Sequence, residues 1–155
     1  MISTDIDYPS GLPCWLFVDY GLQAGEPMLR SEMASGRARQ RRMFTSVPSR
    51  VSVSAIMTDQ QAMLFEAWHR WTLRDGAAWF NAPLKTPIGF GAYVCRFTAM
   101  YAGPALVAPG RWRYTATLEL FERPTLPQGW ELFPEFILDA DIFDVAMNSK
   151  WPEAS

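Results

Sequence analysis

Residues 111–121 alternate apolar and polar side chains more regularly than any other part of this 155-residue chain. Successive side chains of a β-strand point to opposite faces, so this pattern predicts a strand with one buried face. Residues 50–57 and 93–101 show the same alternation. We expect residues 93–101 and 111–121 to pair as a hairpin, and the chain to build a sheet that needs a covering layer.

A helix over residues 59–75 is predicted to supply that layer. Thr58 can cap its first turn with Gln61 three residues on, and Gly76 stands just past its last turn. The spacing of the large apolar residues favours one inward face. That predicted face consists of Leu64, Phe65, Trp68, Trp71 and Thr72.

The remaining segments are short and are separated by glycine and proline. We expect strands at 15–18 and 77–81, the second ending at Pro83, and one or two strands in 28–44 around a Ser35–Gly36 turn. Loops are predicted at 85–91 and 103–110. The sequence therefore favours a mainly β (α+β) fold with one flanking helix. It divides into an N-terminal arm (1–13), a β-rich domain (14–123) and a C-terminal arm (124–155).

Charge is distributed unevenly along the chain. Residues 1–123 hold 13 basic and 10 acidic side chains, whereas residues 124–155 hold 1 and 6. Twelve of the 14 basic residues are arginine, which suits forked hydrogen bonds to carboxylates. Three interpretations of the densest cluster stay open: a salt-bridge seam between subunits, phosphate contact, and a solvated surface. The cluster consists of Arg37, Arg39, Arg41, Arg42 and Arg50.

The C-terminal arm combines large apolar residues with acids but shows no compact element of its own. One interpretation is that the arm folds back on its own domain, with a short helix near 139–148. The other is that it docks on a neighbouring subunit, where its acids would meet the arginines. The candidate interface residues of the arm are Trp130, Phe133, Phe136, Asp139, Asp141 and Asp144.

No catalytic or ligand-binding constellation is evident in the sequence. His69 is the sole histidine, no nucleophile motif or phosphate-binding glycine loop accompanies it, and we expect it at a surface or boundary position. Cys14 and Cys95 are expected to be reduced thiols, although their spacing leaves a disulfide open. We therefore expect no enzymatic activity, cofactor or metal site.

The sequence also bears on targeting and on partners. Residues 1–7 carry two acids and no base, the wrong polarity for a secretory signal, and no 20-residue apolar run is present. We expect a protein made and kept in a cytosol without membrane insertion. The overall net charge of −2 makes nucleic acid an unlikely partner.

Four sequence features, in order, resemble a known class of proteins. They are Gly-Arg-x-Arg-x-Arg-Arg at 36–42, Phe65 and Trp68 on a helix, Gly-Ala-Ala-Trp-Phe at 76–80, and Arg-Trp-x-Tyr-x-x-x-Leu-Glu-Leu at 111–120. Over residues 30–122 this order resembles small tail proteins of tailed bacteriophages, in particular the lambda minor tail protein M type and related tail-tip and baseplate components. The C-terminal arm departs from that pattern.

The resemblance implies an antiparallel β-sandwich or barrel with one flanking helix and no enzymatic site. It implies a structural virion component of the phage tail, assembled in the host cytoplasm. Its expected partners are copies of itself and other tail proteins of the tube, hub and baseplate. The alternative function is a head-tail connector or tail-completion protein that contacts DNA or the portal-proximal tube.

Overall fold

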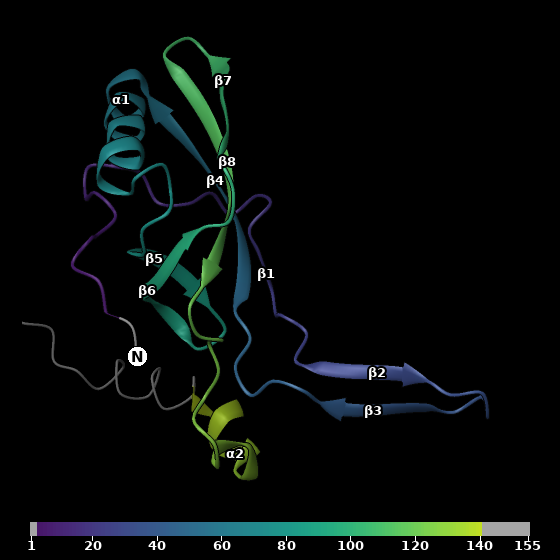
Figure 1. Ribbon diagram of the computed structural model, residues 1–155. Helices are drawn as coiled ribbons and strands as arrows, with labels where there is room; N and C mark the ends of the chain where they lie inside the picture. Colours follow the sequence, from purple (N-terminus) through teal and green to yellow (C-terminus); the bar gives the residue numbers. More distant parts are fainter. Residues whose placement is uncertain (1–2, 141–155) are drawn as a thin grey trace, which may run out of the picture. The chain divides into compact units, whose positions relative to one another are not determined.

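The computed structural model describes residues 3–140, which form a mainly β fold with antiparallel sheets and one principal helix, as predicted (Figure 1). The chain divides into two units, Met1–Pro124 and Thr125–Ser155. The first unit contains a six-stranded sheet in the order β1-β4-β8-β6-β5, with β7 paired to β8, and a separate two-stranded sheet of β2 and β3. The six-stranded sheet consists of β1 (Gly21–Gln23), β4 (Ser49–Thr58), β5 (Phe80–Thr86), β6 (Gly89–Phe97), β7 (Ala102–Ala108) and β8 (Arg111–Leu120).

The two longest strands, β4 and β8, form the centre of this sheet. They pair over ten residues, from Ser49 opposite Leu120 to Thr58 opposite Arg111. Their inward side chains are the ones that the alternation predicts, and cross-strand apolar pairs of this kind stabilise a sheet. The buried inward residues are Val51, Val53, Ala55 and Met57 on β4, and Tyr114, Leu118 and Leu120 on β8.

The expected hairpin between residues 93–101 and 111–121 is wrong. Its two strands would have to pair along the whole edge of β8, but β7 occupies most of that edge. β6 pairs with β8 only at residues 118–120 of β8, and β7 pairs with the first half. Residues 102–108 are thus a strand where a loop was expected. Pro104 is compatible with this strand because β7 is an edge strand, where a residue can lack a backbone N–H without loss of a sheet hydrogen bond. Gly103 is required there, since a Cβ would lie 2.6 Å from the Arg113 carbonyl oxygen.

β5 also differs from the prediction. It runs through Pro83 to Thr86 and forms a tight hairpin with β6, so the expected loop at 85–91 is wrong. Asn81 and Lys85 direct their backbone N–H groups away from β6, and Pro83 has the same orientation by the two-residue period of a strand. Pro83 therefore costs no sheet hydrogen bond, which explains why it lies inside a strand.

The outer edge of β5 is closed by the chain's own N-terminal residues. Asn81 accepts a hydrogen bond from the Tyr8 N–H (2.9 Å) and donates one to the Ile6 carbonyl (2.8 Å). Tyr8 and Leu12 are buried in the core. Residues 3–13 of the predicted N-terminal arm thus pack on the chain's own sheet. No strand forms at 15–18, where Phe17 is 97% exposed and Asp19 adopts a positive φ of 63°.

Tyr20 joins the β1 end of the sheet to β5. Its hydroxyl donates to the Lys85 carbonyl oxygen (2.7 Å) and accepts from the Lys85 N–H (3.0 Å). We expect Tyr20→Phe to lower the free energy of unfolding by about 0.5–1.5 kcal/mol, because two backbone groups lose their partner. Urea unfolding measures this loss. The matched control is Tyr101→Phe, whose removal of a hydroxyl should leave stability nearly unchanged; equal losses for both variants would contradict this role of Tyr20.

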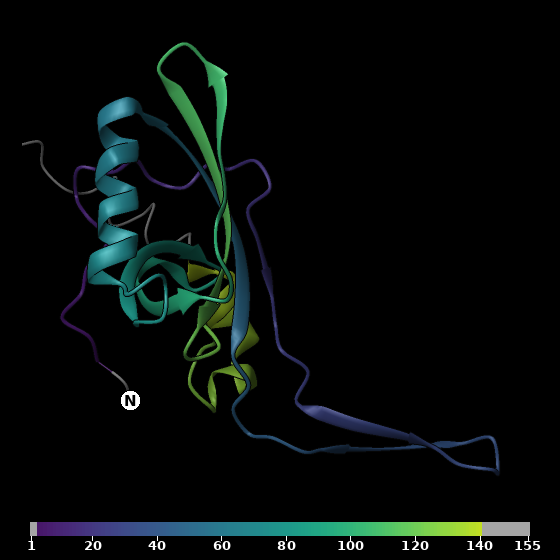
Figure 2. The same cartoon turned by 45° about the horizontal axis from the view of Figure 1, so that its top comes forward.

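The helix begins as predicted. Thr58 caps α1 (Asp59–Ala67) with the expected reciprocal hydrogen bonds to Gln61. The chain then continues as a π-helix from Trp68 to Thr72, not as a regular helix to residue 75. In Figure 2 this helical segment lies over one face of the sheet.

The π-helix changes which side chains face the core. Phe65 and Trp68 are buried as predicted, but Leu64 and Trp71 are exposed, Trp71 by 72%. Leu64 lies in the regular α-helix before the π-helix.

The wider π-helical turn buries Leu73, whose N–H bonds to the Trp68 carbonyl oxygen, in place of the predicted Thr72, which is exposed. His69 lies one helical turn after Phe65, on the same inward side, and is 1% exposed, so its expected surface location is wrong.

Candidate assembly surface

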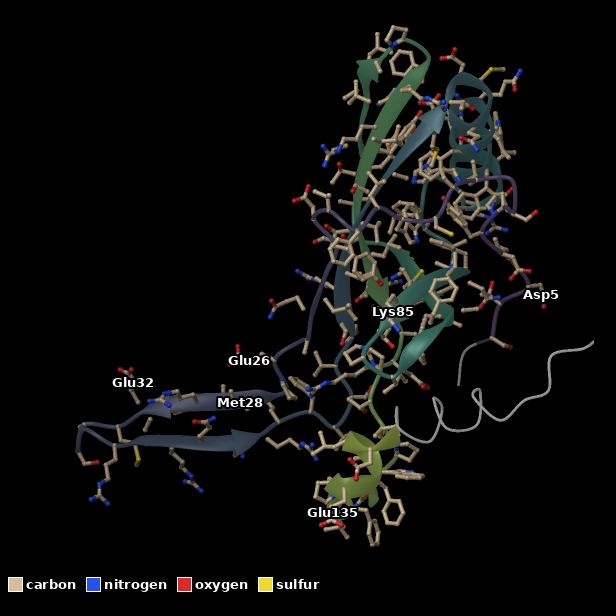
Figure 3. All side chains as sticks on the ribbon, turned by 180° about the vertical axis from the view of Figure 1, so that it is seen from behind. Asp5, Glu26, Met28, Glu32, Lys85 and Glu135 are labelled. Carbon is tan, nitrogen blue, oxygen red and sulfur yellow. The ribbon has the colours of Figure 1, made fainter. Side chains whose placement is uncertain are left out.

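The predicted arginine cluster lies mainly on a β-hairpin formed by β2 (Met28–Glu32) and β3 (Ala38–Arg42). We call residues 28–42 the arginine hairpin. The turn forms at the expected place, with Gly36 at a φ of 79°. Every residue of both strands is exposed except Ala38, which is half-buried. Met28 and Glu32 mark the two ends of β2 in Figure 3. A two-stranded ribbon without a buried face is marginally stable in water, so this hairpin needs a partner surface.

The antiparallel register divides the arginines between the two faces of the ribbon. Arg39 and Arg41 lie opposite Ser31 and Leu29, and therefore share one face. Arg42 lies on the other face with Arg30, and Arg37 lies in the connection before β3. Arg30 also belongs to this surface, although it lies outside the predicted cluster. Its position five residues before Ser35 of the predicted turn is the signal that could have placed it on the partner strand.

No carboxylate neutralises these arginines within residues 3–140. The two ion pairs in this part of the chain are Arg96–Glu119 (2.8 Å) and Arg113–Asp19 (2.9 Å). On the hairpin, Arg30 donates one hydrogen bond to the Gln40 side-chain oxygen (3.3 Å). The hairpin therefore presents forked donors that have no carboxylate partner within residues 3–140.

Large apolar side chains accompany the arginines on the hairpin and its C-terminal flank. Arginine, methionine and aromatic residues together are typical of protein interfaces. Contact with phosphate is electrostatic and does not require apolar side chains, whereas clustered exposed apolar side chains mark contact sites. The exposed apolar residues are Met28, Leu29, Met33, Met43 and Phe44.

Arg50 is separated from the other predicted arginines. It lies on β4, between Gln23 of β1 and Glu119 of β8. It lines a surface hollow of about 360 Å³ together with Gly25 and Pro48, the residues at the base of the arginine hairpin. A Cβ at Gly25 would lie 2.5 Å from the Pro48 carbonyl oxygen, so the two legs of the hairpin approach closely there. Arg50 therefore borders the hairpin but does not belong to it.

The second unit contains the other predicted interface residues. A 3₁₀ turn at Trp130–Leu132 precedes the short helix α2 (Pro134–Leu138). Trp130, Phe133, Phe136 and Asp139 are all exposed. The rings of Phe133 and Phe136 meet edge to face, with centroids 6.2 Å apart. Asp141 and Asp144 lie outside the described residues, as does most of the predicted helix at 139–148.

Residues 125–140, which we call the acidic segment, have no buried residue. Each one is exposed except half-buried Gly129. The segment holds three acids, Glu131, Glu135 and Asp139, and no base. Glu135 is labelled on α2 in Figure 3. Its apolar side chains therefore remain available to a partner. The large ones are Leu126, Trp130, Leu132, Phe133, Phe136, Ile137 and Leu138.

Elsewhere in residues 3–140, no group of three His, Cys, Asp or Glu side chains could hold a metal ion. Both cysteines are free thiols: Cys14 is exposed, and burial raises the pKa of the Cys95 thiol. No helix in this part of the chain is long and apolar enough to cross a membrane.

His69 is a titratable group buried among aromatic side chains. Its ring meets Phe97 and Tyr101 edge to face, each with a centroid distance of 4.8 Å, and its Nε2 atom has no hydrogen-bond partner. Burial lowers the pKa of His69 from its ordinary value of 6.5, an effect that the carboxylate of Asp75 partly opposes. Protonation therefore favours the unfolded chain.

We expect the protein to lose stability as the pH falls from 6.5 toward the lowered pKa of His69. In this window the unfolded chain binds a proton that the folded chain does not, so the free energy of unfolding rises with pH. Thermal unfolding between pH 5 and 7.5 measures this slope. His69→Leu should flatten it, since this chain has no other histidine. If His69→Leu kept the same dependence of stability on pH, titratable groups other than His69 would be its cause.

Comparisons with protein-family models, curated proteins and solved structures find no match for this chain.

Proposed function

We propose that this protein is a structural component of a bacteriophage tail, a ring-forming subunit of the tail tip or baseplate that contacts the tube or hub. The proposal includes assembly in the host cytoplasm, a final location in the virion, and no enzymatic activity. The observation that carries it is the arginine hairpin, a fully exposed ribbon that combines arginines with large apolar side chains. Such a ribbon gains its stability by packing on another subunit.

The order of the elements supports the tail assignment. The arginine-rich segment, the helix with Phe65 and Trp68, and the long strand β8 follow one another as they do in the small tail proteins that the sequence resembles. The structure adds a closed edge at β5 and an exposed hairpin between β1 and β4. This combination suits a subunit whose covered β5 edge cannot pair with strands of other chains, and whose contacts are made through the arginine hairpin.

The test is co-sedimentation of the purified protein with tail-tube and hub proteins of the phage that encodes it. We expect the full chain to bind at least one of them. A variant in which a short glycine-serine linker replaces residues 27–46 should stay folded and lose this binding. Absence of binding by the folded full chain would contradict the proposal.

The second candidate is a head-tail connector or tail-completion protein, favoured by the absence of carboxylate partners for the hairpin arginines within residues 3–140. Arginines on both faces of a ribbon could contact phosphates. Fluorescence anisotropy with duplex DNA distinguishes the two. Binding that falls steeply between 50 and 200 mM salt would support the connector. We expect negligible DNA binding, because the hairpin also exposes apolar residues that phosphate contact does not use.

A further inference from the structure

The arginine hairpin and the acidic segment complement each other, and this inference rests on the proposed function. We infer that the acidic segment of one copy packs on the arginine hairpin of a second copy. Each copy would then give its segment to one neighbour and accept a segment from another. A contact between two different surfaces continues from subunit to subunit and can close into a ring.

Charge is the first argument. The arginine hairpin holds five arginines and one glutamate, a formal charge of +4, whereas the acidic segment holds three acids and no base, a formal charge of −3. Arginine forms charge-assisted, two-pronged hydrogen bonds with carboxylates. Opposite charges on two contact surfaces also speed their encounter and disfavour wrong partners.

Exposed apolar surface is the second argument. Both elements expose large apolar side chains, among them Phe44 beside the hairpin and Trp130 and Phe133 in the acidic segment. Arginine side chains stack on aromatic rings, as Arg96 does on Trp79, where the guanidinium carbon lies 4.5 Å from the ring centre. The two elements can therefore bury apolar area and pair charges in one interface.

The hairpin and the C-terminal residues both start from one end of the sheet. Ser49, the first residue of β4 after the hairpin, pairs with Leu120, the last residue of β8 before the C-terminal residues. The hairpin and the start of the C-terminal residues thus leave the sheet at the same end. Both the hairpin and the acidic segment are exposed in the single chain. A second copy can then supply the missing surface to each, by exchange of an identical element.

Replacing two charged side chains on each element with side chains of the opposite charge tests this inference. One variant carries Arg39→Glu and Arg41→Glu, which share a hairpin face; the other carries Glu135→Lys and Asp139→Lys. All four side chains are exposed, so both variants should fold as the wild type does, checked by near-ultraviolet circular dichroism. Native mass spectrometry at low salt then gives the oligomeric state. We expect each variant alone to associate at least tenfold more weakly than the wild type.

Mixing the two variants is the decisive step. The two new carboxylates on the hairpin of the first variant then meet the two new ammonium groups on the acidic segment of the second, and the reverse pair is wild type. The 1:1 mixture should therefore assemble where neither variant does. Because the two variants must alternate, the mixture closes into the wild-type ring when that ring holds an even number of subunits. The control matched to the hairpin variant is Arg70→Glu with Lys85→Glu, which makes the same charge change at exposed positions elsewhere and should assemble normally.

Three results would overturn the inference. They are a monomeric wild type at low salt, single variants that assemble like the wild type, and a mixture that stays monomeric. If a chain with all four changes assembles while the mixture does not, the acidic segment packs on the hairpin of its own copy. This test can be distinguished from the test of the proposed function. If the mixture recovered oligomers that bound neither tube nor hub proteins, the contact between copies would be supported and the proposed tail function would be contradicted.

Discussion

Phe65→Ala should lower the free energy of unfolding by about 3–5 kcal/mol, the usual cost of removing a buried aromatic ring. Phe65 is 1% exposed. Its ring packs on rings from the helical segment, from β6 and β8, and from the residue before β7, so no single neighbour can move in to fill the space. These rings belong to Trp68, His69, Phe97, Tyr101 and Tyr114.

Met63→Ala is the matched control for this prediction. Met63 lies on the same helix two residues earlier and is 71% exposed, so its truncation should change stability by less than about 0.5 kcal/mol. Equilibrium unfolding in urea measures both variants. A loss below about 1 kcal/mol for Phe65→Ala would mean that α1 does not pack on the sheet in solution.

Ending the chain at Pro124 should abolish self-association and leave the β-rich domain folded. The buried apolar core of the described residues runs from Tyr8 to Leu120, so the truncated chain keeps all of it. It loses the acidic segment, which the inferred contact requires. We expect a monomer with a cooperative thermal transition and a free energy of unfolding within about 1 kcal/mol of the full chain.

Native mass spectrometry and near-ultraviolet circular dichroism check the truncated chain together. A collapsed melting transition with loss of the aromatic signal would show that residues beyond Pro124 belong to the core of their own domain. A truncated chain that still forms the full-length oligomer would show instead that assembly uses other surfaces.

The sequence predicts the centre of the fold well because the signals there are local. The alternation in β4 and β8 reflects one buried face, and the Thr58–Gln61 capping box is satisfied within one turn of chain. The errors occur where the outcome depends on distant residues. Pro83 is acceptable because β5 is an edge strand, and Leu73 is buried in place of Thr72 because the π-helix widens the last helical turn.

The candidate surface is predictable in composition but not in geometry. The arginine run and the Ser35–Gly36 turn indicate a basic hairpin, which the structure contains. The division of arginines between two faces depends on strand register, which the sequence does not fix here. The place of Arg50 in the predicted strand at 50–57 and that of Arg30 before the predicted turn follow from the sequence. A ribbon without a buried face has no apolar alternation from which its register could be predicted.

The most direct test of self-assembly is the mass of the full-length protein by native mass spectrometry or light scattering, at low and at high salt. We predict one defined oligomer at low salt that dissociates as salt screens the contact between arginines and acids. A strict monomer at every salt and protein concentration would contradict the account.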